Sequence, residues 1–97
     1  MITVVAQIIT EEHNIQKVKE IAEKLVMETK KEKGCLEYDL YIDIDDERSM
    51  SMIEKWETKE DLDNHLNSEH FKKLYPEICK YQVGGEVVLY KKYEIIS

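Results

Sequence analysis

The chain has 97 residues, of which 14 are Lys or Arg and 21 are Asp or Glu, so its formal charge is −7 at pH 7 with neutral histidines. This length predicts one domain over residues 1–97, and the acidic balance argues against nucleic acid or a membrane surface as a partner, because both attract clustered basic side chains. No apolar run approaches the roughly 20 residues of a membrane span, and the first residues do not resemble a secretory leader. We therefore expect a soluble, cytoplasmic protein in which Cys35 and Cys79 are reduced, small buried side chains.

The first half of the chain predicts a strand, a long helix and the first arm of a hairpin. Residues 2–9 are rich in β-branched side chains and apolar on both alternating faces, which is typical of a strand covered on both sides. From Asn14 to Lys33 apolar residues recur every three or four positions, and Gly34 follows as a stop signal, so this segment predicts an amphipathic helix. Apolar and polar residues then alternate from Cys35 to Ile44, as in a strand with one buried face. The apolar face of that strand consists of Leu36, Tyr38, Leu40, Ile42 and Ile44.

The second half predicts the return strand, two short helices and a final strand. Residues 49–57 follow a polar turn and alternate again, with Met50, Met52, Glu54 and Trp56 on one face. A capping box opens a short helix over residues 58–67, and Ser68 caps a second helix that we expect Pro76 to bend or interrupt. Two glycines end the helical region, and residues 86–95 predict the last strand.

The order strand, helix, strand, strand, helix pair, strand is that of the ferredoxin-like split βαβ fold. This α+β architecture is a four-stranded antiparallel sheet with its helices on one face. Residues 2–9 and 86–95 are nevertheless apolar on both faces, and helices can cover only one of them. The other face would be a large exposed apolar patch, so we expect a homodimer in which two sheets pack against each other.

The segment from Ile53 to Phe71 resembles the antibiotic biosynthesis monooxygenase family. That family has a Glu-x-Trp strand, a short acidic helix that ends in His, then a small residue and His-Phe. The matching positions here are Glu54 and Trp56, His65, and His70 with Phe71. Gly34 before Cys35, Tyr38 and a strand that starts at the second residue are also similar, so the resemblance spans essentially the whole chain.

This resemblance implies a dimeric α/β barrel with a pocket between sheet and helices in each subunit. Its members include cofactor-independent monooxygenases that act on quinols and polyketide aromatics, haem-degrading enzymes and an isomerase of a phosphorylated signalling sugar. Shared fold and family are therefore a weak guide to the reaction.

His65 and Glu54 are the candidate catalytic residues. A histidine exchanges protons near neutral pH, so His65 can act as a general base toward an acidic hydroxyl or hold the resulting anion. If Glu54 is buried it must be paired or protonated, and we expect it to pair with His65. The alternative is structural: His65 bonds a backbone carbonyl at its helix end, and Glu54 holds His65 or a helix N-terminus without touching substrate.

The candidate substrate-binding residues around this pair are aromatic or adaptable apolar side chains. They are Trp56, Tyr38, Met52, His70 and Phe71. An indole offers a flat wall to an aromatic ligand, and methionine fills irregular apolar space. The same residue types also suit an ordinary core, so composition alone leaves both possibilities open.

We expect no cofactor. His65 and His70 lie five residues apart across a helix break, no third metal ligand follows at a familiar spacing, and no phosphate-binding glycine loop is present. The haem-ligand histidine, distorting tryptophan and first-strand asparagine of the haem-degrading relatives correspond here to Tyr75, His65 and Gln7. These departures disfavour haem degradation. A phosphosugar isomerase would need anion-binding residues, and Arg48, in the hairpin turn, is the only arginine.

These features favour a monooxygenase that uses dioxygen without metal or flavin. An electron-rich phenol or quinol, once deprotonated, can itself pass an electron to dioxygen, so the protein has to bind a small hydrophobic aromatic molecule, stabilise its anion and exclude water. The alternatives are a non-catalytic dimeric module that binds a hydrophobic metabolite and a family-related isomerase. Measurement of oxygen uptake with a panel of quinols and anthrone-like phenols distinguishes an enzyme from a module that only binds its ligand.

Overall fold

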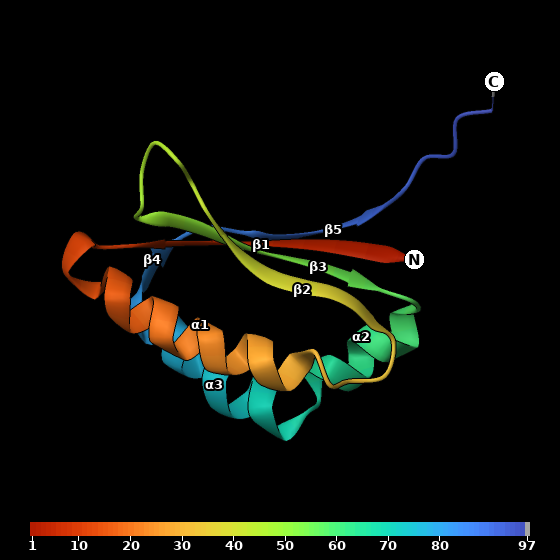
Figure 1. Cartoon of the computed structure of the whole chain (residues 1–97), viewed down its shortest axis with the longest axis horizontal. Helices are drawn as coiled ribbons and strands as arrows, with labels where there is room; N and C mark the ends of the chain where they lie inside the picture. Colours follow the sequence, from red (N-terminus) through yellow and green to blue (C-terminus); the bar gives the residue numbers. More distant parts are fainter. Residues whose placement is uncertain (97) are drawn as a thin grey trace.

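The computed structural model describes residues 1–96, in which three α-helices pack on one face of an antiparallel sheet (Figure 1). In chain order the elements are β1 (Ile2–Thr10), the 3-10 turn η1 (Glu12–Asn14), α1 (Ile15–Thr29), β2 (Cys35–Ile42), β3 (Ser49–Trp56), α2 (Lys59–Leu66), α3 (Glu69–Tyr81), β4 (Gln82–Gly84) and β5 (Val87–Lys91). This is the predicted ferredoxin-like α+β order, with the short β4 as an additional strand. Within the described residues no helix is both long and apolar enough to cross a bilayer.

The central strand of the sheet is β1. It pairs with β3 on one side and with both β4 and β5 on the other, and β2 forms the outer edge beyond β3. The register aligns Tyr38, Glu54, Val4 and Leu89 in one row across β2, β3, β1 and β5. Since residues in register share a face of the sheet, Glu54 lies in the middle of the face that the helices cover.

The helices cover that face because each presents an apolar stripe to it. In α1 the side chains of Val18, Ala22 and Leu25 are buried at helical spacing, while the charged residues between them face solvent. Figure 1 shows α1 and α3 side by side beneath the sheet, with α2 at one end. The predicted N-caps are confirmed: the Thr58 hydroxyl accepts a hydrogen bond from the Asp61 amide at 3.1 Å, and the Ser68 hydroxyl accepts one from Phe71 at 3.3 Å.

The helix boundaries differ from the expectations at two points. The long helix ends at Thr29 rather than Lys33, because residues 30–33 are all charged and have no apolar side chain to bury. Pro76 does not interrupt its helix, since α3 is continuous through it to Tyr81 and packs along α1 on the way.

The sheet also departs from the strict alternation that the sequence predicts. The pairing of β2 with β3 shifts register between Cys35 and Glu37, which makes Leu36 the extra residue of a β-bulge and leaves it 56% exposed. The bulge turns Cys35 toward the core, where it is partly buried. Ile44 lies beyond the end of β2 and is 98% exposed. Cys79, expected to be buried, is exposed on α3.

The last strand is shorter than predicted: β5 ends at Lys91, and residues 92–96 lead away from the sheet (Figure 1). The face of the sheet opposite the helices is not covered by any element of residues 1–96. It carries an apolar row in register, in which Val5 of β1 lies between Ile53 of β3 and Val88 of β5.

Candidate active site

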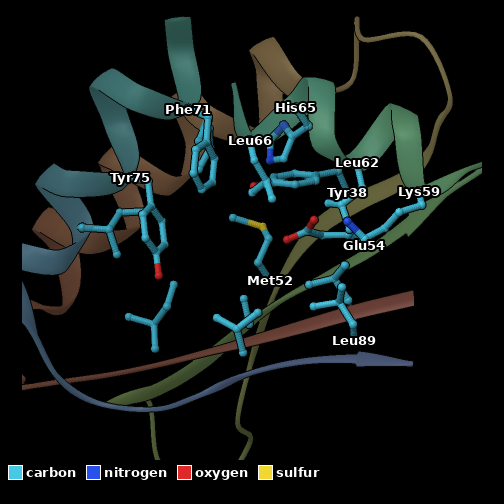
Figure 2. A pocket seen from close by; sticks show the side chains of 16 residues that line it. Tyr38, Met52, Glu54, Lys59, Leu62, His65, Leu66, Phe71, Tyr75 and Leu89 are labelled. Carbon is cyan, nitrogen blue, oxygen red and sulfur yellow. The ribbon is translucent and has the colours of Figure 1, made fainter. Parts of the chain in front are cut away.

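A cavity of about 250 Å³ lies between the covered face of the sheet and helices α2 and α3 (Figure 2). Its floor is formed by the sheet and its roof by the helices. The lining residues of the sheet are Val4, Ala6, Ile8, Tyr38, Met52, Glu54, Val87 and Leu89, and those of the helices are Leu25, Lys59, Leu62, His65, Leu66, Phe71, Tyr75 and Ile78. Most of these side chains are apolar, so a titratable group buried among them is poorly hydrated, and its protein neighbours set its protonation state.

Glu54 brings a carboxyl group into this apolar wall. Its side chain is 5% exposed, and Oε1 accepts a hydrogen bond from the indole Nε1 of Trp56 at 2.9 Å. Burial raises the pKa of Glu54 to about 7, and the hydrogen bond from Trp56 opposes this rise in part. Both the neutral acid and the carboxylate are therefore accessible near neutral pH.

His65 occupies the helix side of the same cavity, in the last turn of α2. Its side chain is 1% exposed and lies among aromatic rings, with ring centroids 4.8 Å from Trp56, 5.3 Å from Tyr38 and 4.8 Å from Phe71. Burial lowers the pKa of His65, and the hydrogen bond and negative charge of Glu32 oppose this effect. The balance favours the neutral imidazole at pH 7.

The two ring nitrogens of His65 have different environments. Nδ1 lies 2.6 Å from Oε2 of Glu32, and because a carboxylate only accepts, Nδ1 carries the proton of the neutral ring. Nε2 is buried and finds no hydrogen-bond partner within residues 1–96. Figure 2 shows the His65 ring at the edge of the cavity with one nitrogen turned toward its interior. The lone pair of Nε2 thus has no protein partner, in a side chain that lines the cavity.

Glu32 holds His65 in this tautomer, and no pattern in the sequence predicts this role. Glu32 lies in the loop between α1 and β2, and its Oε2 also accepts from Nε2 of His70 at 2.9 Å. Nothing in the local sequence distinguishes Glu32, because it stands in a run of charged residues that resembles an ordinary solvated loop. The ligand atoms of Glu32, His65 and His70 lie within 4.8 Å of one another, so this group also has the donor set of a metal site.

The expected pairing of Glu54 with His65 is wrong. Both side chains line the cavity, but Glu54 bonds Trp56 and His65 bonds Glu32. The loop after α1 places Glu32 next to the His65 ring, and the indole of Trp56 donates its hydrogen bond to one oxygen of Glu54. The two candidate catalytic groups therefore lie on the sheet side and the helix side of the cavity and do not form one hydrogen-bonded couple.

The expected lining is met by Tyr38, Met52 and Phe71 but not by Trp56 or His70. Trp56 is fully buried beneath the His65 ring and supports Glu54 instead of forming a wall. His70 lies outside the cavity, because its Nε2 is hydrogen-bonded to the Glu32 carboxylate.

Tyr75 and Lys59 are lining residues that sequence reasoning left without a binding role. The Tyr75 ring stacks on Phe71 with centroids 4.8 Å apart and planes inclined by 11°, which builds an aromatic wall along α3. Burial raises the pKa of Tyr75, so its phenol stays protonated. Lys59 Nζ lies 2.6 Å from Asp63, and this exposed pair sits at the α2 side of the cavity.

The fold and the site define a ferredoxin-like α+β domain with an apolar cavity that carries a carboxyl group on one wall and a neutral imidazole on the other. The family model of antibiotic biosynthesis monooxygenases matches residues 1–76, and the chain belongs to this family.

Solved structures of similar proteins agree with this assignment. A structure described as an antibiotic biosynthesis monooxygenase is 36% identical, with a TM-score of 0.91, and the match covers 97% of this chain and 100% of the other. A conserved protein from Methanosarcina mazei Go1 is 30% identical over 95% of this chain and 92% of its own, with a TM-score of 0.92. A protein from Pseudomonas aeruginosa is 26% identical over 96% and 94% of the two chains, with a TM-score of 0.87. The search of proteins with curated functions gave no match.

Proposed function

We propose that this protein is a monooxygenase that oxidises a small aromatic phenol or quinol with dioxygen and needs no cofactor of its own. The observation that carries the proposal is the free Nε2 of His65, a buried base without a hydrogen-bond partner among residues 1–96, in the wall of an apolar cavity. Family membership and a similar structure described as a monooxygenase support the same class of reaction.

The first step is removal of a phenolic proton by Nε2 of His65. The Nδ1–H bond to Glu32 fixes the tautomer in which Nε2 accepts, and the Glu32 carboxylate stabilises the imidazolium that forms. This is the way in which an acid residue supports a histidine base in other enzymes. The resulting phenolate is electron-rich enough to transfer one electron to dioxygen. The substrate radical and superoxide then combine into a peroxide anion, which takes the proton held by the His65 imidazolium to become a hydroperoxide.

Glu54 acts in its neutral form in this scheme. A charged carboxylate beside a phenolate would raise the energy of the anion, whereas the carboxylic acid can donate a hydrogen bond and a proton. Breakdown of the hydroperoxide needs such a proton, because the O–O bond breaks and one oxygen leaves as water. For a substrate with a CH₂ group next to the ring, the sum is R₂CH₂ + O₂ → R₂C=O + H₂O, in which the carbon is oxidised and dioxygen reduced.

The apolar lining contributes by excluding water from the anion and the radicals. Met52, Phe71 and Tyr75 line the cavity to one side of His65 and Glu54 (Figure 2), and they offer aromatic and polarisable contacts to a flat ring. With little water present, the electrostatic effect of each wall group is larger than it would be in solution.

The test is oxygen consumption by the purified protein with a panel of benzoquinols, naphthoquinols and anthrones. The proposal predicts uptake above the uncatalysed rate for at least one member and incorporation of one atom of ¹⁸O₂ into the product. Binding to the cavity without oxygen uptake, measured by quenching of Trp56 fluorescence, would instead favour a module that binds a hydrophobic metabolite.

The isomerase alternative gains no support from the side chains around the cavity. Arg48 is paired with Asp46 in the hairpin turn and is not among the lining residues, and Lys59 in the lining is already paired with Asp63. A phosphate group would thus compete with an existing ion pair for its cation.

We also propose that the protein acts as a homodimer joined through the uncovered face of the sheet. The apolar row of Ile53, Val5 and Val88 supports this proposal, as does Tyr90 of β5, which is half-exposed next to that row. Light scattering at micromolar concentration should give twice the chain mass, and Val5→Lys should give the monomer mass because it places a charge in the interface. A monomer mass for the unmodified protein would contradict the proposal.

A further inference from the structure

We propose that Glu32, His65 and His70 form a binding site for a zinc ion on the side of His65 that faces away from the cavity. The three residues come from the loop after α1, the end of α2 and the first turn of α3. Their potential ligand atoms are Oε2 of Glu32, Nδ1 of His65 and Nε2 of His70.

The distances allow the three ligand atoms to share one ion after side-chain movements of roughly 1 Å. Oε2 of Glu32 lies 2.6 Å from Nδ1 of His65 and 2.9 Å from Nε2 of His70, and all three atoms lie within 4.8 Å of one another. In a tetrahedral site with zinc–ligand distances near 2.1 Å, ligand atoms are roughly 3.4 Å apart. The two short contacts must therefore open by roughly 0.5–0.8 Å. The two imidazole nitrogens, which lie within 4.8 Å of each other, must close by up to roughly 1.4 Å. Rotation of the Glu32 and His70 side chains, both of which are partly exposed, can supply these movements.

The donor set suits zinc and provides three protein ligands, the usual number for a zinc site that also binds a water molecule. Two imidazole nitrogens and one carboxylate oxygen are a common zinc combination, with water in the fourth position. Glu32 and His70 retain 15% and 22% exposure of their side chains, so an ion can reach the cluster from solvent. The single negative charge of Glu32 offsets part of the charge of the ion.

Zinc at this position would control the base in the cavity, a consequence that rests on the proposed function. Coordination by Nδ1 requires its lone pair, so the ring proton of His65 must move to Nε2. The nitrogen that faces the cavity then changes from an acceptor to a donor and can no longer remove a phenolic proton. Because the imidazole ring stands between the ion and the cavity, zinc acts through His65 and not on the substrate.

The experiment is titration of the purified protein with Co²⁺, whose visible absorption reports tetrahedral coordination, followed by competition with Zn²⁺. We expect one site per chain. Glu32→Gln and His70→Ala should each weaken binding by at least about 10-fold, the scale on which metal sites respond to changes around the ligands. The matched control is His13→Ala, which removes an exposed histidine that lies 3.6 Å from Glu11. It should leave Co²⁺ binding unchanged.

Absence of tetrahedral Co²⁺ bands would overturn the inference, as would binding that both variants retain at full strength. Circular dichroism identifies a variant that fails to fold. His70→Ala, at a partly exposed position, keeps the test open if Glu32→Gln unfolds. The titration needs no substrate, so it separates the two proposals. Metal binding without oxygen uptake by the metal-free protein would reject only the oxygenase proposal, and oxygen uptake without metal binding would reject only the zinc site.

Discussion

The buried carboxyl group of Glu54 should make the protein less stable as the pH rises. In the folded chain its pKa is raised by burial to about 7, from a usual value of 4.5. The folded state therefore binds this proton more tightly than the unfolded state, and the free energy of unfolding falls as pH increases between about 4.5 and 7. A difference of roughly 2.5 pKa units, at about 1.4 kcal/mol per unit, sets an upper limit of about 3 kcal/mol on the loss.

Glu54→Gln isolates this contribution, because glutamine is neutral at every pH and its amide oxygen can still accept from Trp56. Urea unfolding at fixed protein concentration, followed by circular dichroism at pH 5, 6, 7 and 8, gives the free energy of unfolding of both proteins. We expect similar values at pH 5 and an advantage for Glu54→Gln of up to about 3 kcal/mol at pH 8. Glu57→Gln, an exposed position just beyond the same strand, is the control and should not show this trend. Parallel pH profiles for wild type and Glu54→Gln would refute the reasoning.

Two further predictions concern the loop that carries Glu32 and the tautomer that Glu32 imposes. Gly34 has φ of +78° and a Cβ there would overlap the side chain of Asp61, so Gly34→Ala should lower the free energy of unfolding by roughly 1–3 kcal/mol. Gly84→Ala, whose added Cβ meets Ile9 at 3.6 Å, should cost less in the same chemical-denaturation assay. Nitrogen-15 NMR of metal-free protein at pH 8 should show His65 protonated on Nδ1, and Nε2 protonation would contradict the hydrogen bond to Glu32.

The architecture follows from local patterns in the sequence, which explains why most of it is predictable. Alternation in β3 and three-to-four spacing in α1 each define one buried face, and the caps Thr58 and Ser68 mark where α2 and α3 begin. The bulge at Leu36 and the short β4 are set by pairing with neighbouring strands, which the local sequence does not contain.

The two candidate catalytic residues of the site were predictable, but part of its lining and most of its contacts were not. Glu54 and His65 stand out because they occupy motif positions of a known family, and both line the cavity. Glu32 reaches His65 across 33 positions of sequence, so its role depends on tertiary structure. Trp56 was expected in the wall, but the His65 ring lies over it and its indole serves Glu54 instead.

Oxygen uptake by wild type and His65→Ala, measured side by side with the best quinol or anthrone substrate, tests the central claim most directly. Removal of a general base should reduce the rate by roughly 10²-fold or more, while circular dichroism shows that the variant is folded. His13→Ala, a change at an exposed histidine, should retain the wild-type rate. Equal uptake by wild type and folded His65→Ala would contradict the claim that Nε2 of His65 is the base in this cavity.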